Sequence, residues 1–337
     1  MVSSQTVDSV LAMSKIIWVA VLTLWASAAQ ADEIDVTATP VPLNPADPQQ
    51  TRVDSLEYVA GLELTSPAPE WGGYSGMFMD DDGGSIVAVS DVGHELGLDL
   101  RHDSDGKLTG VGTAHIFPLL DESGKAISGK EWSDAEAIAV APRQAAVFVA
   151  FERNHRLWRY PIIIDADEVP AQAVETPPDI GALPGNAGIE GLLVDEQGGM
   201  VLLAESGDQN GAGRGWVKNG QEWQSFSIER SDGFEPTDIA AFGDSSLVLL
   251  ERRYNEKDGP AARISLLPHT FDGSPVAGYT LAVLRLPLSV DNFEAIATRA
   301  APGGGRFIYL LSDNNQNPQQ RTLLLQFRLP SPEIGTP

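Results

Sequence analysis

The 337-residue chain contains no cysteine. This absence excludes disulfide bonds, thiolate nucleophiles, iron–sulfur clusters and thiolate zinc sites. Basic residues are scarce, with 22 Lys and Arg against 47 Asp and Glu, so the net charge is −25. Such acidity disfavours binding to nucleic acid or to a membrane surface, and it suits divalent cations or cationic partners. Acidity of this kind also keeps exported proteins soluble.

The apolar run near the N-terminus is short. It covers 11 residues from Ile16 to Ala26, whereas a membrane-spanning helix needs about 20. Lys15 precedes the run and Ala29-Gln30-Ala31 follows it, which is the pattern of a secretory signal peptide. We therefore predict a signal peptide over 1–31, starting at Met13, and a periplasmic or secreted mature protein that is not inserted in the membrane.

No cysteine follows the apolar run, so a lipoprotein anchor is excluded. Residues 32–52 carry four prolines and are predicted to form a flexible lead-in. Residues 331–337 are predicted to be a tail. The domain between them, 53–330, is expected to be a monomer that acts on a small-molecule substrate or a divalent cation.

Sustained helical periodicity is also missing, and a hairpin pattern recurs instead. The first strand of each hairpin begins with a turn or small residue, then a polar residue, then an apolar run. A Gly-, Pro- or Asp-containing turn leads into a second apolar strand that ends in an acid. The five first strands begin at Gly73, Asp134, Gly188, Pro236 and Asn292.

The repeat has a regular period. From Ser75 through Glu136, Glu190, Asp238 and Glu294 the steps are 61, 54, 48 and 56 residues. Such a period fits a four-stranded unit, and radial repetition of four-stranded units is typical of a β-propeller. We predict an all-β fold with one propeller of five four-stranded blades. The last blade lacks an outer strand, which the segment 55–64 is expected to supply, closing the ring. Six blades and a stacked sandwich remain as alternatives.

The repeat predicts a ring of carboxylates at one mouth of the central channel. In antiparallel hairpins the start of the first strand and the end of the second lie at the same edge. We expect this arrangement to bring together eight carboxyls that could bind calcium, a cation that takes oxygen ligands. They are Glu136, Glu152, Glu190, Glu205, Asp238, Glu251, Glu294 and Asp313.

Crowded carboxylates need compensating positive charge. Arginines beside the acids could provide it, and so could calcium, with neutral oxygens from Asn186, Asn292, Asn314 and Asn315. Alternatively, each acid serves only to cap a turn or to pair with a neighbouring arginine. The candidate catalytic residues are Arg153, Arg252, Arg253, Arg321 and His155.

Three segments resemble one known family. They are Phe151-Glu152-Arg153-Asn154-His155-Arg156, Asp291-Asn292-Phe293-Glu294-Ala295 and Ser312-Asp313-Asn314-Asn315, the last followed by Gln320-Arg321-Thr322-Leu323-Leu324. Together they resemble the family named for esterase-like activity of phytase, the phytase-like β-propeller domain, over about residues 53–330. The resemblance implies an exported propeller and, by its name, phosphoester hydrolysis. Alkaline phytases, a neighbouring propeller family, use carboxylate-held calcium for that reaction.

Two functions follow from these observations. One is a calcium-dependent phosphoesterase in which arginines stabilise the developing charge on the phosphate. The other is a non-catalytic module of the cell envelope that binds a cation, a cationic ligand or a sugar. A phosphoesterase needs arginines that point into the mouth, whereas a binding module needs them turned into pairs between blades. Ester hydrolysis by Ser75 lacks a plausible base.

Overall fold

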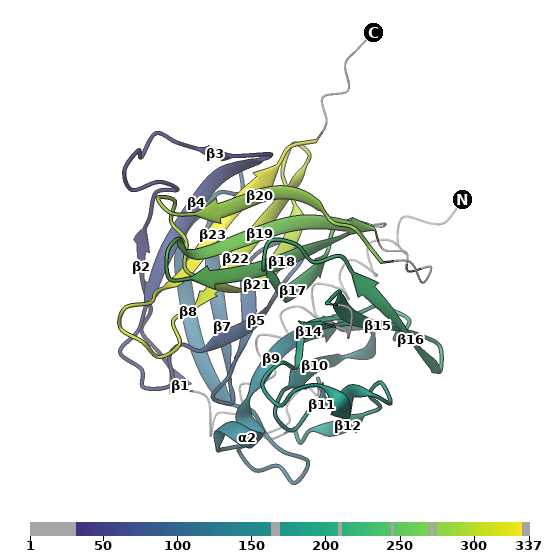
Figure 1. The fold of residues 1–337 in the computed structure, drawn as a ribbon. Helices are drawn as coiled ribbons and strands as arrows, with labels where there is room; N and C mark the ends of the chain where they lie inside the picture. The colour runs from purple at the N-terminus through teal and green to yellow at the C-terminus, as the bar shows by residue number, and fades with distance from the viewer. Residues whose placement is uncertain are drawn as a thin grey trace, which may run out of the picture.

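The computed structural model describes residues 32–162, 169–207, 211–243, 246–268, 271 and 275–331. The predicted signal peptide and most of the predicted tail lie outside these ranges. Over the described residues the chain forms a five-bladed propeller of antiparallel sheets (Figure 1). This arrangement confirms the predicted fold and blade number. Among the described residues, no helix is both long and apolar enough to span a bilayer.

Each of the first two blades is built from four consecutive strands. In blade 1 the strands run outward from the channel as β5, β6, β7 and β8, and in blade 2 as β9 to β12. A short helix, α2 (Lys130–Ser133), precedes blade 2, and a 3-10 turn (Pro142–Gln144) lies inside its first hairpin. The bounds are β5 (Tyr74–Met79), β6 (Ser85–Ser90), β7 (His94–His102), β8 (Leu108–Pro118), β9 (Ala135–Ala141), β10 (Ala146–Phe151), β11 (Arg156–Pro161) and β12 (Gln172–Val174).

Blades 3 and 4 repeat this order, after a second 3-10 turn (Ile180–Ala182). Blade 3 contains β13 to β16 and blade 4 contains β17 to β20. The bounds are β13 (Ile189–Val194), β14 (Met200–Gly207), β15 (Gly213–Asn219), β16 (Glu222–Ile228), β17 (Glu235–Ala241), β18 (Ser246–Asn255), β19 (Gly259–Pro268) and β20 (Tyr279–Arg285).

Blade 5 joins the two ends of the propeller. Its inner strands are β21 (Asn292–Ala300), β22 (Arg306–Asp313) and β23 (Thr322–Leu329), and its outer strand is β4 (Leu56–Thr65). Figure 1 shows the purple β4 beside the yellow β23. Their antiparallel register runs from Thr322↔Leu64 to Arg328↔Glu57. The predicted closure is therefore confirmed, and the edge of β23 is not left open.

Residues 32–52 differ from the predicted flexible lead-in, because they lie against the propeller. β1 (Asp32–Glu33) pairs with β8, while β2 (Thr37–Pro40) and β3 (Arg52–Val53) pair with β4. The Leu43 side chain is buried, and its carbonyl accepts a hydrogen bond from the backbone N–H of Ser289. The prolines interrupt regular pairing here, yet the apolar residues between them still find buried positions.

The core is divided among the five contacts between neighbouring blades. Each contact holds one cluster of buried apolar side chains. In β6, Ile86 and Ala88 face the cluster shared with blade 5, whereas Val87 and Val89 face the one shared with blade 2. Because alternate residues of a strand point to opposite faces, inner strands buried on both faces must be apolar throughout. This burial explains the short apolar runs of the repeat.

Candidate functional site

The first strand of every blade carries a one-residue bulge near its start. The bulged residue has no partner on the second strand, and the register shifts by one at that point. Bulges re-aim a side chain and are frequent next to active sites. Here they fall at equivalent positions around the channel, at Ser75, Glu136, Glu190, Thr237 and Glu294.

A second set of side chains lies beside the bulges. In each blade the residue two positions before the bulge is paired with, or bonded to, a residue at the end of the second strand. We call the two sets together, with Asp134, the acidic mouth. The second-strand residues are Asp91, Glu152, Glu205, Arg252 and Asp313.

Blade 4 departs from the predicted ring. Its equivalent positions are held by Thr237 and Arg252, each one residue away from the predicted Asp238 and Glu251. The Asp238 carboxylate accepts backbone N–H groups of Ile239 at 2.7 Å and Ile296 at 2.8 Å, so it links blades 4 and 5. Both oxygens of Glu251 bond the Arg263 guanidinium at 2.6 Å. Both acids therefore serve pairings outside the acidic mouth.

Glycine allows two of the mouth acids to approach the first strands. A Cβ at Gly188 would lie 2.6 Å from the Cβ of Glu152, and one at Gly73 would lie 2.2 Å from Oδ1 of Asp91. Gly73 also has a φ of 71°, which other residues rarely adopt. Substitution of either glycine would displace the acid beside it.

The mouth carboxyls hold protons more tightly than free carboxyls do. Burial is the main cause, and repulsion between neighbouring acids adds to it. These two effects raise the pKa of Glu152 and of Asp313 to about 7 and that of Glu294 to about 8. They also raise the pKa of Glu136 and of Glu190 well above the ordinary range.

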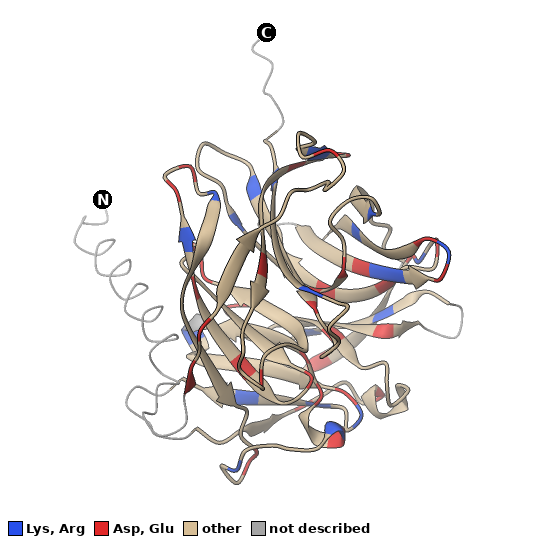
Figure 2. Ribbon diagram, turned by 90° about the vertical axis from the view of Figure 1, so that its left-hand side faces the viewer, with Lys and Arg blue, Asp and Glu red and all other residues tan. Residues whose placement is uncertain are grey.

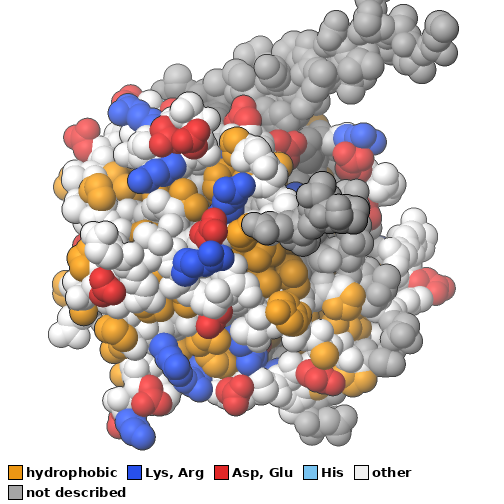
Figure 3. Space-filling view, turned by 90° about the horizontal axis from the view of Figure 1, so that it is seen from above, with side chains coloured by type: hydrophobic (Ala, Val, Ile, Leu, Met, Phe, Trp, Pro, Cys, Tyr) orange, Lys and Arg blue, Asp and Glu red, His pale blue; other side chains and the backbone are white. Residues whose placement is uncertain are grey.

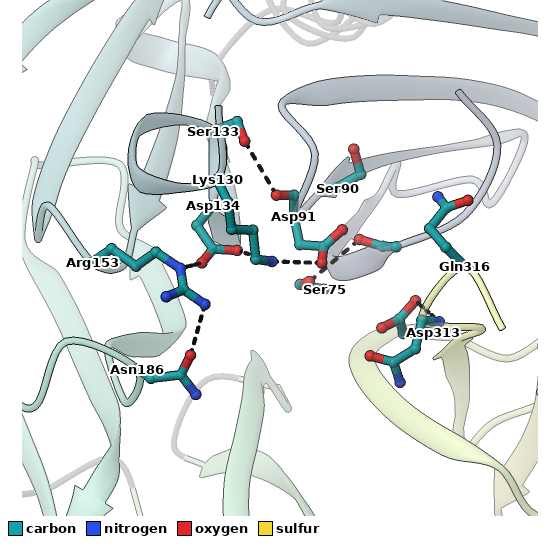
Figure 4. A network of polar contacts seen from close by, with 12 residues as sticks. Ser75, Ser90, Asp91, Lys130, Ser133, Asp134, Arg153, Asn186, Asp313 and Gln316 are labelled. Atoms are coloured by element: carbon teal, nitrogen blue, oxygen red, sulfur yellow. Dashed lines mark hydrogen bonds and ion pairs between the residues drawn. The ribbon is translucent and has the colours of Figure 1, made fainter. Parts of the chain in front are cut away.

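Three cations lie among these acids. The Lys130 ammonium contacts Asp91 at 2.7 Å and Asp134 at 2.5 Å. Arg153 contacts Asp134 from the other side, and Figure 4 shows these side chains in one continuous series of polar contacts. Arg252 reaches Glu205 at 3.0 Å and Glu294 at 3.2 Å.

Negative charge still exceeds positive charge at the mouth. Against these three cations stand eight carboxyls: Asp91, Asp134, Glu136, Glu152, Glu190, Glu205, Glu294 and Asp313. Figures 2 and 3 show acidic and basic side chains interspersed elsewhere, along the strands and on the face seen from above. The excess at the mouth is therefore local, and it favours the uptake of a cation or of protons.

Three of the acids are close enough to bind one metal ion. Asp134, Glu136 and Glu152 each offer a carboxylate oxygen, and these oxygens lie within 4.8 Å of one another. All are hard oxygen donors, as calcium and magnesium prefer. Nearby, Oε2 of Glu294 is buried without a hydrogen-bond partner among the described residues. The donor set therefore fits a divalent cation.

Asp134 was not among the predicted ligands. It opens the second hairpin and was interpreted only as a turn residue. The signal that could have identified it is the spacing Asp134-Ala135-Glu136, which places two acids on the same side of a strand. Its side chain is fully buried and is contacted by both Lys130 and Arg153.

The remaining predicted residues divide between the mouth and its surroundings. Of the four candidate arginines, Arg153 and Arg252 lie in the mouth. Arg253 instead donates to the carbonyl of Asp232, and Arg321 pairs with Asp291 at 3.4 Å. A His155 ring nitrogen lies 3.0 Å from the carbonyl of Pro184.

Two of the four predicted amides contact mouth side chains. Asn186 accepts a hydrogen bond from Arg153. Asn292 donates to Glu294 and accepts from Arg252. The Asn314 side chain accepts backbone N–H groups of Gly73 and Gln316, whereas Asn315 is exposed. Two amides are therefore bound to the acids and arginines of the mouth, and the other two are not.

The sequence matches one family model, described as Phytase-like, esterase-like activity of phytase, over residues 69–316. No curated protein matches the chain. Solved structures similar to it include the nidogen/laminin complex, with 13% identity, 85% of this chain and 87% of that one covered and a TM-score of 0.42. The Cps50 (Swd1) propeller domain of Myceliophteria thermophila has 6% identity, 86% and 99% coverage and a TM-score of 0.41. The fold assignment rests on the strand pairing described above.

Proposed function

Since this chain belongs to the phytase-like family described by esterase-like activity of phytase, we propose that it is a calcium-dependent phosphoesterase acting at the acidic mouth. The observation that carries the proposal is the meeting of a buried three-carboxylate cluster with arginines at the same opening. Acids alone would suit a cation-binding module. A phosphoesterase also needs fixed cations for the phosphate oxygens, and Arg153, Arg252 and Lys130 supply them.

The acids of the mouth would hold the cation. Asp134, Glu136 and Glu152 are the ligands that we propose, because their oxygens already converge. A bound divalent cation would neutralise these carboxylates and the substrate phosphate and would acidify a water molecule. Lys130 and Arg153 both contact Asp134, so they lie next to any anion drawn to this cluster.

Arg252 and Glu294 would act on the reacting phosphate. Arg252 presents a planar set of donors beside Glu205 and Glu294, a geometry suited to two phosphate oxygens at once. Glu294, whose pKa is raised to about 8 by burial, keeps its proton at neutral pH. It can therefore donate that proton to the departing alcohol, as a general acid should.

Hydrolysis assays test the proposal. The chain from residue 32 onward is expected to release phosphate from phosphomonoesters or phytate only with calcium. Arg252→Gln should lower kcat by about 100-fold or more, the usual cost of removing a donor to a developing charge. The matched control is Arg143→Gln, because Arg143 forms an exposed pair with Glu196 away from the mouth.

No phosphate release from any substrate in the panel, with calcium present, would refute the phosphoesterase. Calcium binding without hydrolysis would instead support the binding module. Equal losses of activity in Arg252→Gln and Arg143→Gln would show that the mouth arginine has no special role.

We also propose that the protein is exported. The sequence pattern over 13–31 supports this, as does the absence of cysteine from a chain whose large core needs no disulfide. N-terminal sequencing of the protein from the periplasm or the medium is expected to begin at Asp32. Full-length protein confined to the cytoplasm would contradict export.

A further inference from the structure

A second concave site lies between blades 4 and 5. It has a volume of about 930 Å³, and we call it the arginine–amide groove. Blade 4 lines it with Arg252, Arg253 and Tyr254, and blade 5 lines it with Asp291, Arg321 and residues of the loop 315–320. Because Arg252 also contacts Glu205 and Glu294, the groove opens beside the acidic mouth.

The groove carries net positive charge in a strongly acidic protein. Its two lining acids are already paired, Glu235 with Arg230 at 3.1 Å and Asp291 with Arg321 at 3.4 Å. Arg253 forms no ion pair with a described residue, since its guanidinium donates to a backbone carbonyl and lies over Phe234. Three arginines against two acids, in a chain of net charge −25, make the groove a local site for an anion.

Arg321 keeps most of its donors available. Its Nε bonds Asp291, while Nη1 is 4.0 Å from the nearest Glu63 oxygen. No hydrogen bond joins either terminal nitrogen to a described residue. A guanidinium with both terminal nitrogens available can bind a carboxylate or a phosphate with two parallel hydrogen bonds.

The remaining lining suits a ring with hydroxyl groups. The side chains of Asn315 and Gln319 are exposed and make no hydrogen bond to a described residue. Amides offer donors and acceptors together, as hydroxyl groups require. Tyr254, at the end of β18, is 73% exposed and presents a flat apolar face with a polar tip.

The blade 5 wall is held in place before any ligand arrives. Oδ1 of Asp313 accepts the N–H of Asn315, and the Asn314 side chain accepts that of Gln316. The Gln316 amide in turn donates to the carbonyl of Trp71 in the first-blade region. A wall already ordered loses less conformational entropy when a ligand binds.

We propose that the arginine–amide groove binds an acidic sugar, a hydroxyl-bearing ring that carries one anionic group. The anion contacts Arg321, with Arg253 nearby, while the ring packs on Tyr254 and its hydroxyls bond the amides of the loop. A carboxylate and a phosphate share this chemistry. This binding goes beyond the proposed phosphoesterase and requires no calcium.

Calorimetric titration in EDTA tests the proposal with three probes: galacturonate, galactose 6-phosphate and galactose. At least one of the two charged sugars is expected to bind at millimolar concentration or below, and galactose at least tenfold more weakly. The tighter of the two charged sugars identifies the anionic group. Tyr254→Ala and Arg321→Gln should each weaken binding of that sugar at least tenfold, which corresponds to about 1.4 kcal/mol.

Matched controls come from the same two blades. Tyr279 in β20 is 68% exposed outside the groove, and Arg328 in β23 donates to the carbonyl of Gly304. Tyr279→Ala and Arg328→Gln should leave binding unchanged. Equal binding of galactose, no binding of either charged sugar, or binding unaffected by Tyr254→Ala would overturn the proposal. Tyr254 is largely exposed, so its variant folds, and the EDTA keeps the result independent of the calcium site.

Discussion

A chain that begins at residue 66 is expected not to form a stable monomer. It lacks β4, and therefore the outer strand of blade 5 and the whole ladder with β23. It also loses the buried side chains of Leu56, Leu62 and Leu64. Burial of a leucine contributes roughly 1.5–3 kcal/mol. Three such losses approach the total stability of about 5–15 kcal/mol that is usual for a domain.

A chain that begins at residue 51 is the matched control. It loses β1, β2 and the buried Leu43 but keeps β4, so it should fold and melt several °C lower than the chain from residue 32. Thermal unfolding followed by circular dichroism, together with gel filtration, distinguishes these outcomes. A monomeric chain from residue 66 with the melting temperature of the control would show that β4 does not close the ring.

The metal-free protein is expected to become less stable as the pH rises from about 5 to about 9. Burial raises the pKa of Glu152 and Asp313 to about 7 and that of Glu294 to about 8 in the folded state. Above the ordinary carboxyl pKa the folded state therefore binds more protons than the unfolded state. Stability then falls as pH increases, through the range in which these folded groups lose their protons.

Calcium should reverse this trend, because it favours the ionised carboxylates. With free calcium at 100 times its dissociation constant, the folded state gains about 2.7 kcal/mol. For a domain of this size that gain raises the melting temperature by roughly 5 °C or more. The gain should be large at pH 8.5 and vanish near pH 5, where protons compete for the ligands. Scanning calorimetry with calcium and with EDTA measures both trends.

Glu190→Gln provides a direct check on the cause. The pKa of Glu190 is raised by burial and by repulsion from Glu205 and Glu294, so removing its charge should stabilise the metal-free protein at pH 8.5. It should also reduce the gain from calcium. Glu196→Gln, at an exposed acid paired with Arg143, should change neither quantity. A melting temperature that ignores calcium at every pH would eliminate the calcium site.

Most of the fold could be predicted from the repeat. A hairpin whose strands are apolar throughout needs neighbours on both faces, and five copies at a period near 55 residues leave a ring of blades as the solution. The missing strand of the last blade indicated that 55–64 closes the ring. The docking of 32–52 escaped prediction, because short strands between prolines carry no periodic signal.

The candidate site was predicted less fully. Three of the blades aligned well, since Glu136, Glu190 and Glu294 all occupy the bulge. In blade 4 the predicted pair, Asp238 and Glu251, was separated by 13 residues, whereas Thr237 and Arg252 are separated by 15, as Glu190 and Glu205 are. The two acids attracted the alignment by their charge. The unequal separation was the available sign of a displaced register.

The sequence by itself determined the number of blades, the closing strand and the gathering of acids at one mouth, because these depend on repeats spread over many residues. Only the tertiary structure decided which acids face the mouth. Adjacent residues of a strand point to opposite faces, so one bulge per blade decides between Thr237 and Asp238, and between Arg252 and Glu251. The same choice placed an arginine in the ring and joined Glu251 to Arg263 instead.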